Sequence, residues 1–215
     1  MISPRILLPF VIFGAFAADD AVTWKFDNLT NIGGHAVTVL GAPKVIETPE
    51  GKSIQFNGVN DALFLEVHPL AGAAAFTWEV IFRPDSDGPA AQRFFHMQEN
   101  GTQNRYLFET RIINKQWCLD SFAATSAGSR ALMDTALLHP ADRWYHVAVT
   151  YDGEVYKNYV NGKTQVHAAV KLAPQGPGRT SVGVRINKVD YFKGAILLSR
   201  MTRRALSPAE FLKAP

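Results

Sequence analysis

The sequence predicts an all-β protein: a two-sheet antiparallel β-sandwich of the jelly-roll type that ends in a short helix. Three observations predict this fold. More than ten short segments alternate between apolar and polar residues, and turn-forming residues separate them. The length of 215 residues suits one sandwich domain, and 47% apolar with 19% charged residues indicates a globular chain with a packed core.

The first residues have the composition of a secretory signal peptide. Arg5 supplies an early positive charge, an apolar run extends from Ile6 to Phe16, and Ala15-Phe16-Ala17 is a small-residue cleavage pattern. The apolar run is shorter than the roughly 20 residues that a membrane-spanning helix needs. We therefore expect residues 1–17 to be removed and residues 18–215 to form one exported domain, secreted or periplasmic, with no membrane partner.

The first half of the exported chain reads as a series of strands. They are expected at Ala21–Asp27, Ser53–Asp61, Ala62–Val67, Phe76–Arg83, Arg93–Gln98, Tyr106–Ile113 and Gln116–Ala123, and a short apolar run lies at Ala36–Leu40. An Asn57-Gly58 turn closes Ser53–Asp61, and Ala62–Val67 is expected to pair with that strand. Pro84 ends the strand Phe76–Arg83, which should lie in the middle of its sheet. The small residues of Ala124–Arg130 predict a loop.

The segment from Arg143 to Lys163 predicts a β-hairpin followed by a further turn. Aromatic and β-branched residues dominate from Trp144 to Tyr151, and Asp152-Gly153 and Asn161-Gly162 supply residues that tolerate positive φ. Alternation puts Tyr145, Val147, Val149 and Tyr151 on one face and Trp144, His146, Ala148 and Thr150 on the other. Neither face is plainly polar, so either both are covered or one lines a groove.

The remaining elements follow the same logic. Thr164–Leu172 and Thr180–Asn187 predict strands, and the Gly- and Pro-rich residues 173–178 predict a loop between them. A closing strand begins near Tyr191, and Ser207 with Pro208 marks the start of a short helix.

Several of these segments resemble laminin-G-like domains of the concanavalin A-like lectin/glucanase superfamily. The hairpin resembles W-x-H-V-A-x-T-Y-D-G…Y-V-N-G, and Phe76–Arg83 resembles F-T-I-E-A-W-V. Phe56–Asp61 resembles F-D-G-x-x-D, and residues 192–210 resemble F-x-G-x-I-D-E-V-R-I-Y-N-R-A-L-S-x-x-E. The resemblance implies a concanavalin A-like jelly roll. It leaves function open, because the superfamily holds lectins, glycosidases, lyases and adhesion modules.

Charge and cysteine content narrow the function classes. The net charge is +3 and the basic residues are scattered through the chain, so nucleic acid is not an expected partner. Cys118 is the only cysteine, which excludes an intramolecular disulfide. Its apolar surroundings in sequence predict a small buried hydrophobe rather than a catalytic thiol.

The resemblance implies a ligand site on the concave sheet. It would bring together Glu79, Arg83, Glu109, Arg111, His146, Asn158 and Arg185, with Trp144 and Tyr159 as flat surfaces. Such mixtures suit sugars, because apolar ring faces stack on aromatic side chains while hydroxyls need charged or amide partners. The alternative is structural: Glu79 with Arg83 or Arg111 forms a cross-strand ion pair.

No catalytic motif is evident. The E-x-D-x-x-E pattern of retaining glycosidases of this fold is absent, and no two acidic residues have the spacing for convergent carboxylates on one strand. A polysaccharide lyase would need a base, for which His146 or Tyr159 is a candidate, with Arg111 and Asn158 to neutralise a uronate.

The sequence predicts no cofactor, and calcium is the one metal ion that it leaves possible. Many members of the superfamily hold calcium, but Leu197-Leu198 stands where their acidic residues lie, which leaves Asp27, Asn60 and Asp61 as possible ligands. We therefore expect a secreted, non-catalytic domain that binds a polysaccharide, another glycan or an extracellular protein. The alternative is a polysaccharide-degrading enzyme, a lyase or a glycoside hydrolase.

Overall fold

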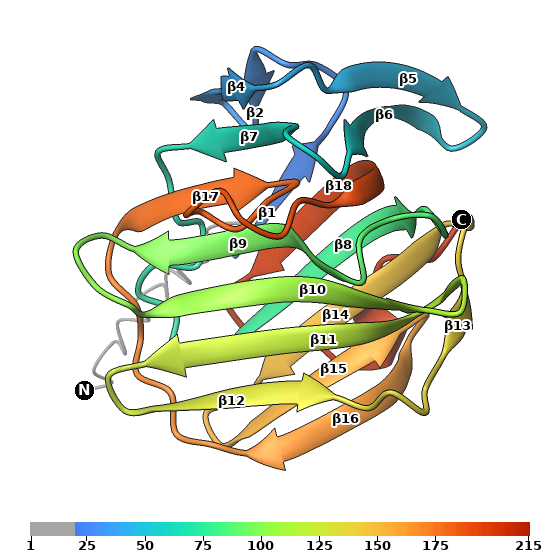
Figure 1. The fold of residues 1–215 in the computed structure, drawn as a ribbon. Helices are drawn as coiled ribbons and strands as arrows, with labels where there is room; N and C mark the ends of the chain where they lie inside the picture. Colours follow the sequence, from blue (N-terminus) through green and yellow to red (C-terminus); the bar gives the residue numbers. More distant parts are fainter. Residues whose placement is uncertain (1–19) are drawn as a thin grey trace, which may run out of the picture.

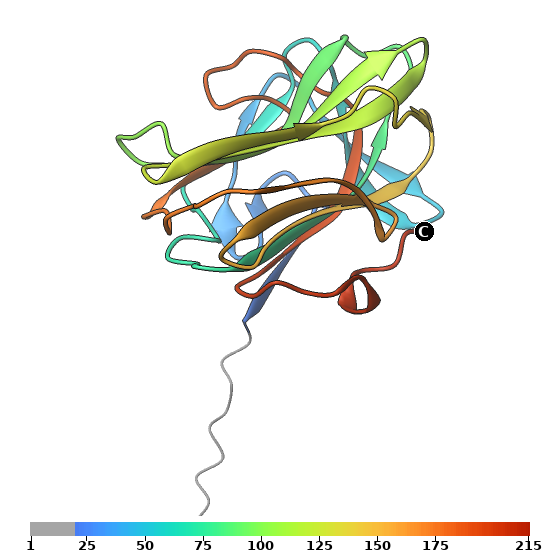
Figure 2. The same cartoon turned by 90° about the horizontal axis from the view of Figure 1, so that it is seen from below.

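The protein is a sandwich of two antiparallel sheets, seen from the front in Figure 1 and edge-on in Figure 2. The computed structural model describes residues 20–215, so the predicted signal peptide, residues 1–17, lies outside the described residues. The predicted fold class, an all-β two-sheet antiparallel sandwich, is confirmed. Within residues 20–215, no helix has the length and apolar character needed to cross a bilayer.

The front sheet faces the viewer in Figure 1. Its strands are β4 (Thr38–Leu40), β7 (Ala62–Leu65), β9 (Ala91–Glu99), β10 (Arg105–Ile113), β11 (Gln116–Thr125), β12 (Gly128–Met133), β13 (His139–Pro140) and β17 (Gly178–Val182). Their order is β12-β11-β10-β9-β17-β7-β4, and β13 pairs with β11. The long strands β9, β10 and β11 therefore lie side by side.

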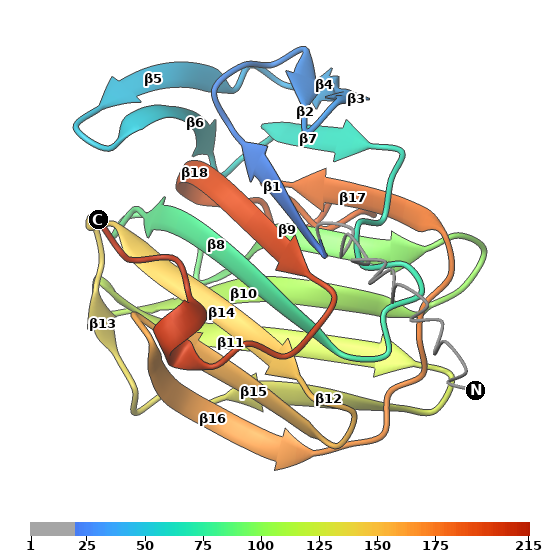
Figure 3. The same ribbon diagram turned by 180° about the vertical axis from the view of Figure 1, so that it is seen from behind.

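The back sheet faces the viewer in Figure 3. Its strands are β1 (Ala21–Lys25), β5 (Lys44–Thr48), β6 (Gly51–Asn57), β8 (Phe76–Pro84), β14 (Tyr145–Tyr151), β15 (Val155–Val160), β16 (Lys163–Ala169) and β18 (Lys193–Thr202). Their order is β16-β15-β14-β8-β18-β6-β5, and β1 pairs with β18. A small ribbon of β2 (Asn31–Ile32) and β3 (His35–Ala36) stands apart from both sheets.

Aromatic side chains fill the space between the sheets. The rings of Trp78 and Phe108 lie 4.3 Å apart, and those of Phe82 and Phe94 stack at 4.4 Å. All four side chains are fully buried. Successive side chains of a strand point to opposite faces. Glu79 and Arg83, which follow Trp78 and Phe82 along β8, therefore point to the outside of the sandwich.

The predicted hairpin is confirmed. The strands β14 and β15 meet at Asp152-Gly153, where the Asp152 carboxylate accepts the backbone N–H groups of Glu154 and Val155 at 3.0 and 2.8 Å. Asn161 and Gly162 have φ values of 49° and 74° and join β15 to β16. As predicted, β8 is central, with β14 on one side and β18 on the other.

The expected pairing of Ala62–Val67 with the strand before it is wrong. The strand β6 pairs with β5 and β18 in the back sheet, whereas β7 pairs with β4 and β17 in the front sheet. The turn at Asn57–Asp61 carries the chain from one sheet to the other. Buried Asp61 holds this crossing, because its carboxylate accepts the N–H groups of Ala42 and Asn57 at 2.8 and 3.1 Å.

The predicted short C-terminal helix is confirmed as a single 3-10 turn, Pro208–Glu210 (η1). Ser207 is its N-cap, and Glu210 accepts the Ser207 N–H at 2.9 Å.

Two other expectations need correction. The predicted loop Ala124–Arg130 is instead a tight connection from β11 into the edge strand β12, whose small, exposed residues carry little strand signal. The predicted strand Thr180–Asn187 ends at Val182, because Gly183 takes a φ of 82° and residues 183–192 leave the sheet as a loop.

Gly183 closes the base of that loop and generates a stability prediction. Its N–H donates to Phe94 O and its carbonyl accepts the Phe192 N–H, both at 2.9 Å. A Cβ at Gly183 would lie 2.4 Å from the buried Phe56 ring. We expect Gly183→Ala to lower the free energy of unfolding by about 1–2 kcal/mol through its left-handed backbone and by a further ~1–3 kcal/mol through overpacking.

Urea unfolding measures this change, and Gly153→Ala is the matched control. Gly153 has a φ of 101° but no atom within 4 Å of an added Cβ, so only the backbone contribution applies there. Equal losses in the two variants would contradict the packing argument.

Candidate functional site

The predicted site residues divide between the two outer faces of the sandwich. Glu79 and Arg83 lie on β8 and His146 on β14, all in the back sheet. Glu109 and Arg111 lie on β10, in the front sheet. The expectation that these five side chains converge in one groove is therefore wrong. The alternation of side chains along each strand does predict that these five residues point away from the core. It does not show that β8 and β10 belong to opposite sheets.

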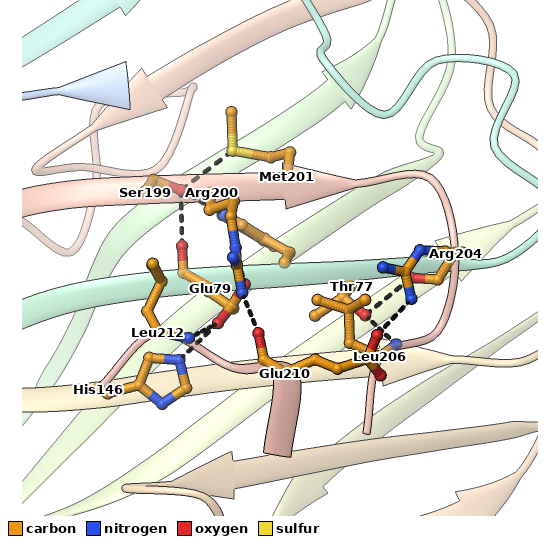
Figure 4. A network of polar contacts seen from close by, with 11 residues as sticks. Thr77, Glu79, His146, Ser199, Arg200, Met201, Arg204, Leu206, Glu210 and Leu212 are labelled. Carbon is orange, nitrogen blue, oxygen red and sulfur yellow. Dashed lines mark hydrogen bonds and ion pairs between the residues drawn. The ribbon is translucent and has the colours of Figure 1, made fainter. Parts of the chain in front are cut away.

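On the back sheet, Glu79 is the centre of a buried polar network (Figure 4). Its carboxylate contacts His146 Nε2 at 3.0 Å and Arg200 Nε at 2.5 Å, and it accepts the backbone N–H of Leu212 at 2.7 Å. Burial raises the pKa of Glu79, but these donors together outweigh it and hold the pKa below its ordinary value. The structural alternative in which Glu79 pairs with Arg83 or Arg111 is also wrong, because its partners are His146 and Arg200.

The C-terminal segment, residues 205–212, runs over the outer face of the back sheet near β14 (Figure 3), and its contacts with Glu79, Ala148 and Tyr159 cover the network from outside. Leu206 and Phe211 form an apolar cluster with Ala148 and Tyr159, and the rings of Phe211 and Tyr159 lie 5.1 Å apart. Arg200 Nη2 also donates to the Glu210 carbonyl at 2.8 Å. As a result the side chain of His146 is 1% exposed, and residue Tyr159 is 5% exposed. Neither proposed lyase base is open to a polysaccharide on this face.

Arg83 and Trp144 lie together where β8 ends and β14 begins. The Arg83 guanidinium lies 5.9 Å from the Trp144 ring centre, and its Nε is 3.4 Å from Asp85. Trp144 is half-buried just before β14. These two residues are accessible, but Glu79 lies outside their contacts.

Asn158 lies between the sheets rather than on either outer face. Its Nδ2 donates to Ser121 Oγ at 3.2 Å and to Leu132 O at 3.0 Å, both in the front sheet. Its Oδ1 accepts the Val166 N–H at 2.8 Å, where the pairing of β15 with β16 is irregular. The side chain is fully buried and bonded at both ends, so it ties the two sheets together and offers no group to a ligand.

The outer face of the front sheet carries an open hollow of about 220 Å³ that we call the arginine hollow. It is lined by Arg93, Arg105, Leu107, Glu109, Arg111, Asp120, Phe122, Ala131 and Arg185. Three of the predicted site residues, Glu109, Arg111 and Arg185, are thus brought together. Strands β9 to β12 supply most of the lining, and the loop 183–192 supplies Arg185.

Ion pairs link the acidic residues of the hollow to two of its arginines. Glu109 Oε2 lies 2.9 Å from Arg93 Nε and 3.1 Å from Arg111 Nη2. The same Arg111 nitrogen lies 2.5 Å from Asp120 Oδ2, and Arg93 Nη1 lies 2.7 Å from Asp190 Oδ2. Glu109 and Asp120 are direct cross-strand partners, so Arg111 bridges two neighbouring carboxyl groups.

The protonation state of this carboxyl pair is unusual. Burial, and then the charge of Asp120, raise the pKa of Glu109 to about 7, even though Arg93 and Arg111 oppose the rise. Burial also raises the pKa of Asp120, and Arg111 limits that shift. At neutral pH the Glu109 carboxyl group is therefore partly protonated.

The other two arginines have no carboxylate partner. No Asp or Glu oxygen within residues 20–215 forms an ion pair with Arg105 or Arg185. The Arg105 guanidinium lies 4.7 Å from the centre of the Phe122 ring. Burial and the nearby charge of Arg185 lower the pKa of Arg105.

Sequence reasoning missed Arg93, Arg105, Asp120 and Phe122. The signal for Asp120 was present, because strands at Tyr106–Ile113 and Gln116–Ala123 joined by the two residues Asn114 and Lys115 place residue 109 opposite residue 120. Both turn residues have positive φ, 50° and 61°, as a two-residue hairpin turn requires.

The possible calcium ligands are not gathered at one place. Asp27 lies at a hollow with Lys25 and Glu50, whereas Asp61 lies at another. The Asn60 side-chain oxygen accepts Asn57 Nδ2 at 2.8 Å. In the part of the chain that the structure describes, no three His, Cys, Asp or Glu side chains are grouped to hold a metal ion.

Cys118 is buried, and burial raises the pKa of its thiol.

The Glu79 network predicts a large stability change. Glu79→Ala removes the partner of Arg200 and His146 and the acceptor of the Leu212 N–H. We expect the free energy of unfolding to fall by roughly 3–5 kcal/mol, as for other broken buried ion pairs. Chemical denaturation measures it against Glu47→Ala, which removes an exposed pair with Lys52 and should change stability by about 0–1 kcal/mol. A Glu79 effect no larger than the control would show that the network does not hold the segment.

Glu109 predicts a pH dependence of stability. Its pKa is about 7 in the folded protein against 4.5 in the absence of structure, so the folded state binds the proton more tightly. Its contribution is fully present below about pH 4.5 and is lost as the pH rises to about 7. The groups that face it are Arg93, Arg111, Asp120 and Arg185.

We therefore expect Glu109→Gln to gain stability relative to the native protein as the pH rises across this window. Thermal melts of both proteins at intervals from pH 4.5 to 7.5 measure the difference. A constant difference would contradict the raised pKa.

Comparison with solved structures agrees with this architecture. Domain 4 of AbnA, a GH43 extracellular arabinanase from Geobacillus stearothermophilus solved with arabinotriose, is similar with a TM-score of 0.58 and 16% identity. The match covers 88% of this chain and 94% of that chain. The binding domain of Paraclostridial Mosquitocidal Protein 1 is similar with a TM-score of 0.65 and 12% identity, over 89% of this chain and 51% of that chain.

A third similar structure is the binding domain of Botulinum Neurotoxin DC in complex with SialylT. Its TM-score is 0.64 at 13% identity, with 89% of this chain and 49% of that chain covered. The chain thus spans about half the length of the two toxin binding domains. At these identities the likeness shows the fold alone. Among curated protein sequences, none matches the chain.

A family model supplies the assignment that the solved structures leave open. It is described as the concanavalin A-like lectin/glucanases superfamily and matches residues 57–211, which include the central hairpin, β8 to β11 and the closing strand β18. The chain therefore belongs to the concanavalin A-like lectin/glucanase superfamily, in its laminin-G branch.

Proposed function

We propose that this protein is a secreted, non-catalytic domain that binds carbohydrate in the arginine hollow. The observation that carries the proposal is the difference between the two outer faces. The C-terminal segment covers Glu79, His146 and Tyr159 on the back sheet and leaves Arg83 and Trp144 accessible, whereas the arginine hollow on the front sheet is open and gathers four arginines. A ligand of the sheet surface has access to charged and aromatic side chains on the front face.

The chemistry of the hollow suits a sugar. Guanidinium groups donate hydrogen bonds to hydroxyl and ring oxygens. Leu107, Phe122 and Ala131 add apolar surface for the C–H faces of a sugar ring. Two of the similar structures hold a glycan, arabinotriose in one and SialylT in the other, which supports a carbohydrate ligand for this fold.

Export supports the same proposal. The apolar run at the start of the chain suits a signal peptide, and the arabinanase whose domain 4 is similar is extracellular. A secreted or periplasmic location would expose the hollow to polysaccharides and to glycans on other proteins.

A second candidate function is polysaccharide cleavage by Glu109 and Asp120. The favouring observation is that these neighbouring carboxyl groups face an open hollow, with the pKa of Glu109 raised to about 7. Glycosidases need one protonated and one ionised carboxyl group. Release of reducing ends from a polysaccharide panel, lost in Glu109→Gln, would favour this candidate. Binding without any release favours the non-catalytic domain.

A glycan array followed by calorimetry tests the binding function. Arg185 is the residue to change, because its removal leaves no carboxylate unpaired, whereas Arg111→Ala would leave the buried Asp120 without an ion-pair partner. We expect Arg185→Ala to weaken glycan binding by about tenfold or more, the loss of a charge-assisted hydrogen bond, with little change in melting temperature. Arg143→Ala is the matched control, since Arg143 is exposed and outside the hollow.

Two results would overturn the proposal. One is the absence of binding to every glycan tested at millimolar concentration. The other is glycan binding that Arg185→Ala leaves unchanged, which would move the site away from the arginine hollow.

A further inference from the structure

We infer that the arginine hollow selects sugar residues that carry an acidic group, a carboxylate or a sulfate ester. This inference rests on the proposed function and specifies its ligand class. Two arginines of the hollow are paired with acidic residues of the protein, and two have no such partner.

Two arginines of the hollow are already neutralised by the protein. Arg93 contacts both Glu109 and Asp190, and Arg111 contacts both Glu109 and Asp120. Each of these guanidinium groups thus has two acidic neighbours within 3.1 Å.

Arg105 and Arg185 are the unneutralised pair. Both line the hollow, both are half-buried, and neither has an ion-pair partner among residues 20–215. The buried Nε of Arg105 has no hydrogen-bond acceptor in the described structure, while its Nη1 donates to the Gln103 carbonyl at 2.7 Å. Two like charges held in one partly buried hollow are unfavourable without a counter-charge.

Neighbouring groups report the same positive field. His96 lies on β9, opposite Leu107 of the hollow. Its pKa is lowered to about 3 by burial and then by the charges of Arg185 and Arg105. His96 is therefore neutral and contributes no charge of its own at neutral pH. At that pH Glu109 is also partly protonated, which further reduces the negative charge available inside the hollow.

The two arginines are presented from different elements and are held in place. Arg105 begins β10 and lies over the ring of Phe122 at 4.7 Å. Arg185 projects from the loop 183–192, whose ends are fixed by the backbone bonds of Gly183 with Phe94 and Phe192. A planar guanidinium fork matches a carboxylate or sulfate in bidentate geometry, so a preorganised pair of forks favours an acidic sugar over a neutral one.

Paired polymers that differ only in charge test the inference. The probes are polygalacturonate, alginate and hyaluronan with the carboxyl-reduced form of each, and dextran sulfate with dextran. The mature protein, Arg185→Gln and the control Arg143→Gln are measured by calorimetry at two salt concentrations. We expect the native protein to bind at least one acidic polymer about tenfold or more tightly than its neutral counterpart. Arg185→Gln should lose that preference, and Arg143→Gln should keep it.

The outcomes separate the inference from the proposed function. Equal binding of acidic and neutral partners, weakened for both by Arg185→Gln, would keep carbohydrate binding and overturn the acidic preference. Binding of none of the polymers would contradict both. Equal affinity for single-stranded DNA of matched charge would show attraction to any polyanion and would also overturn the inference. A preference confined to the carboxylate pairs or to the sulfate pair identifies which acidic group is recognised.

Discussion

The buried carboxylate of Glu79 is the constraint on which the arrangement of this molecule depends. It joins three adjacent back-sheet strands, since it lies on β8, contacts His146 on β14 and contacts Arg200 on β18. It also accepts the Leu212 N–H and so holds the last residues of the chain against the sheet. A buried ionised carboxylate is tolerated only when donors surround it, and here they do. One interaction therefore organises the centre of the back sheet and closes its outer face.

The two outer faces use the same residue types to opposite effect. On the back sheet, the Glu79 carboxylate has three donors and an apolar cover of Leu206 and Phe211, so both of its oxygens are bonded within the chain, while His146 Nδ1 has no partner among residues 20–215. On the front sheet, the lining of the hollow holds four arginines and two carboxyl groups. Two of the arginines form ion pairs with these carboxyl groups, and the other two form none. Satisfied networks stabilise a fold, whereas incomplete ones have capacity for a ligand. The contrast is stronger evidence for a site than charge or aromatic content alone.

The fold was predictable from local patterns, and the site was predictable only in part. Turn residues and alternation located the hairpin at Asp152-Gly153 and the central strand β8, because these depend on neighbours in sequence. The crossing at Asp61 was missed, since an Asn-Gly turn does not show whether the next strand stays in the same sheet. For the same reason Glu79 and Glu109 were assigned to one groove. That a C-terminal segment covers His146 depends on tertiary contacts that no local pattern carries.

The position of Arg185 shows how a sheet surface acquires a site without altering the sandwich. Strands β9, β10 and β11 place their outward side chains at fixed spacings, and they supply three of the arginines and both carboxyl groups of the hollow. The turn to positive φ at Gly183 ends β17 early and lets the following loop bring one more guanidinium to the hollow. Because that loop is bonded to the core through Phe94 and Phe192, the added charge is held rather than free to reach solvent. The sheet thus supplies Arg105, the loop supplies Arg185 together with the Asp190 that pairs with Arg93, and changes in the loop can alter ligand preference while leaving the core intact.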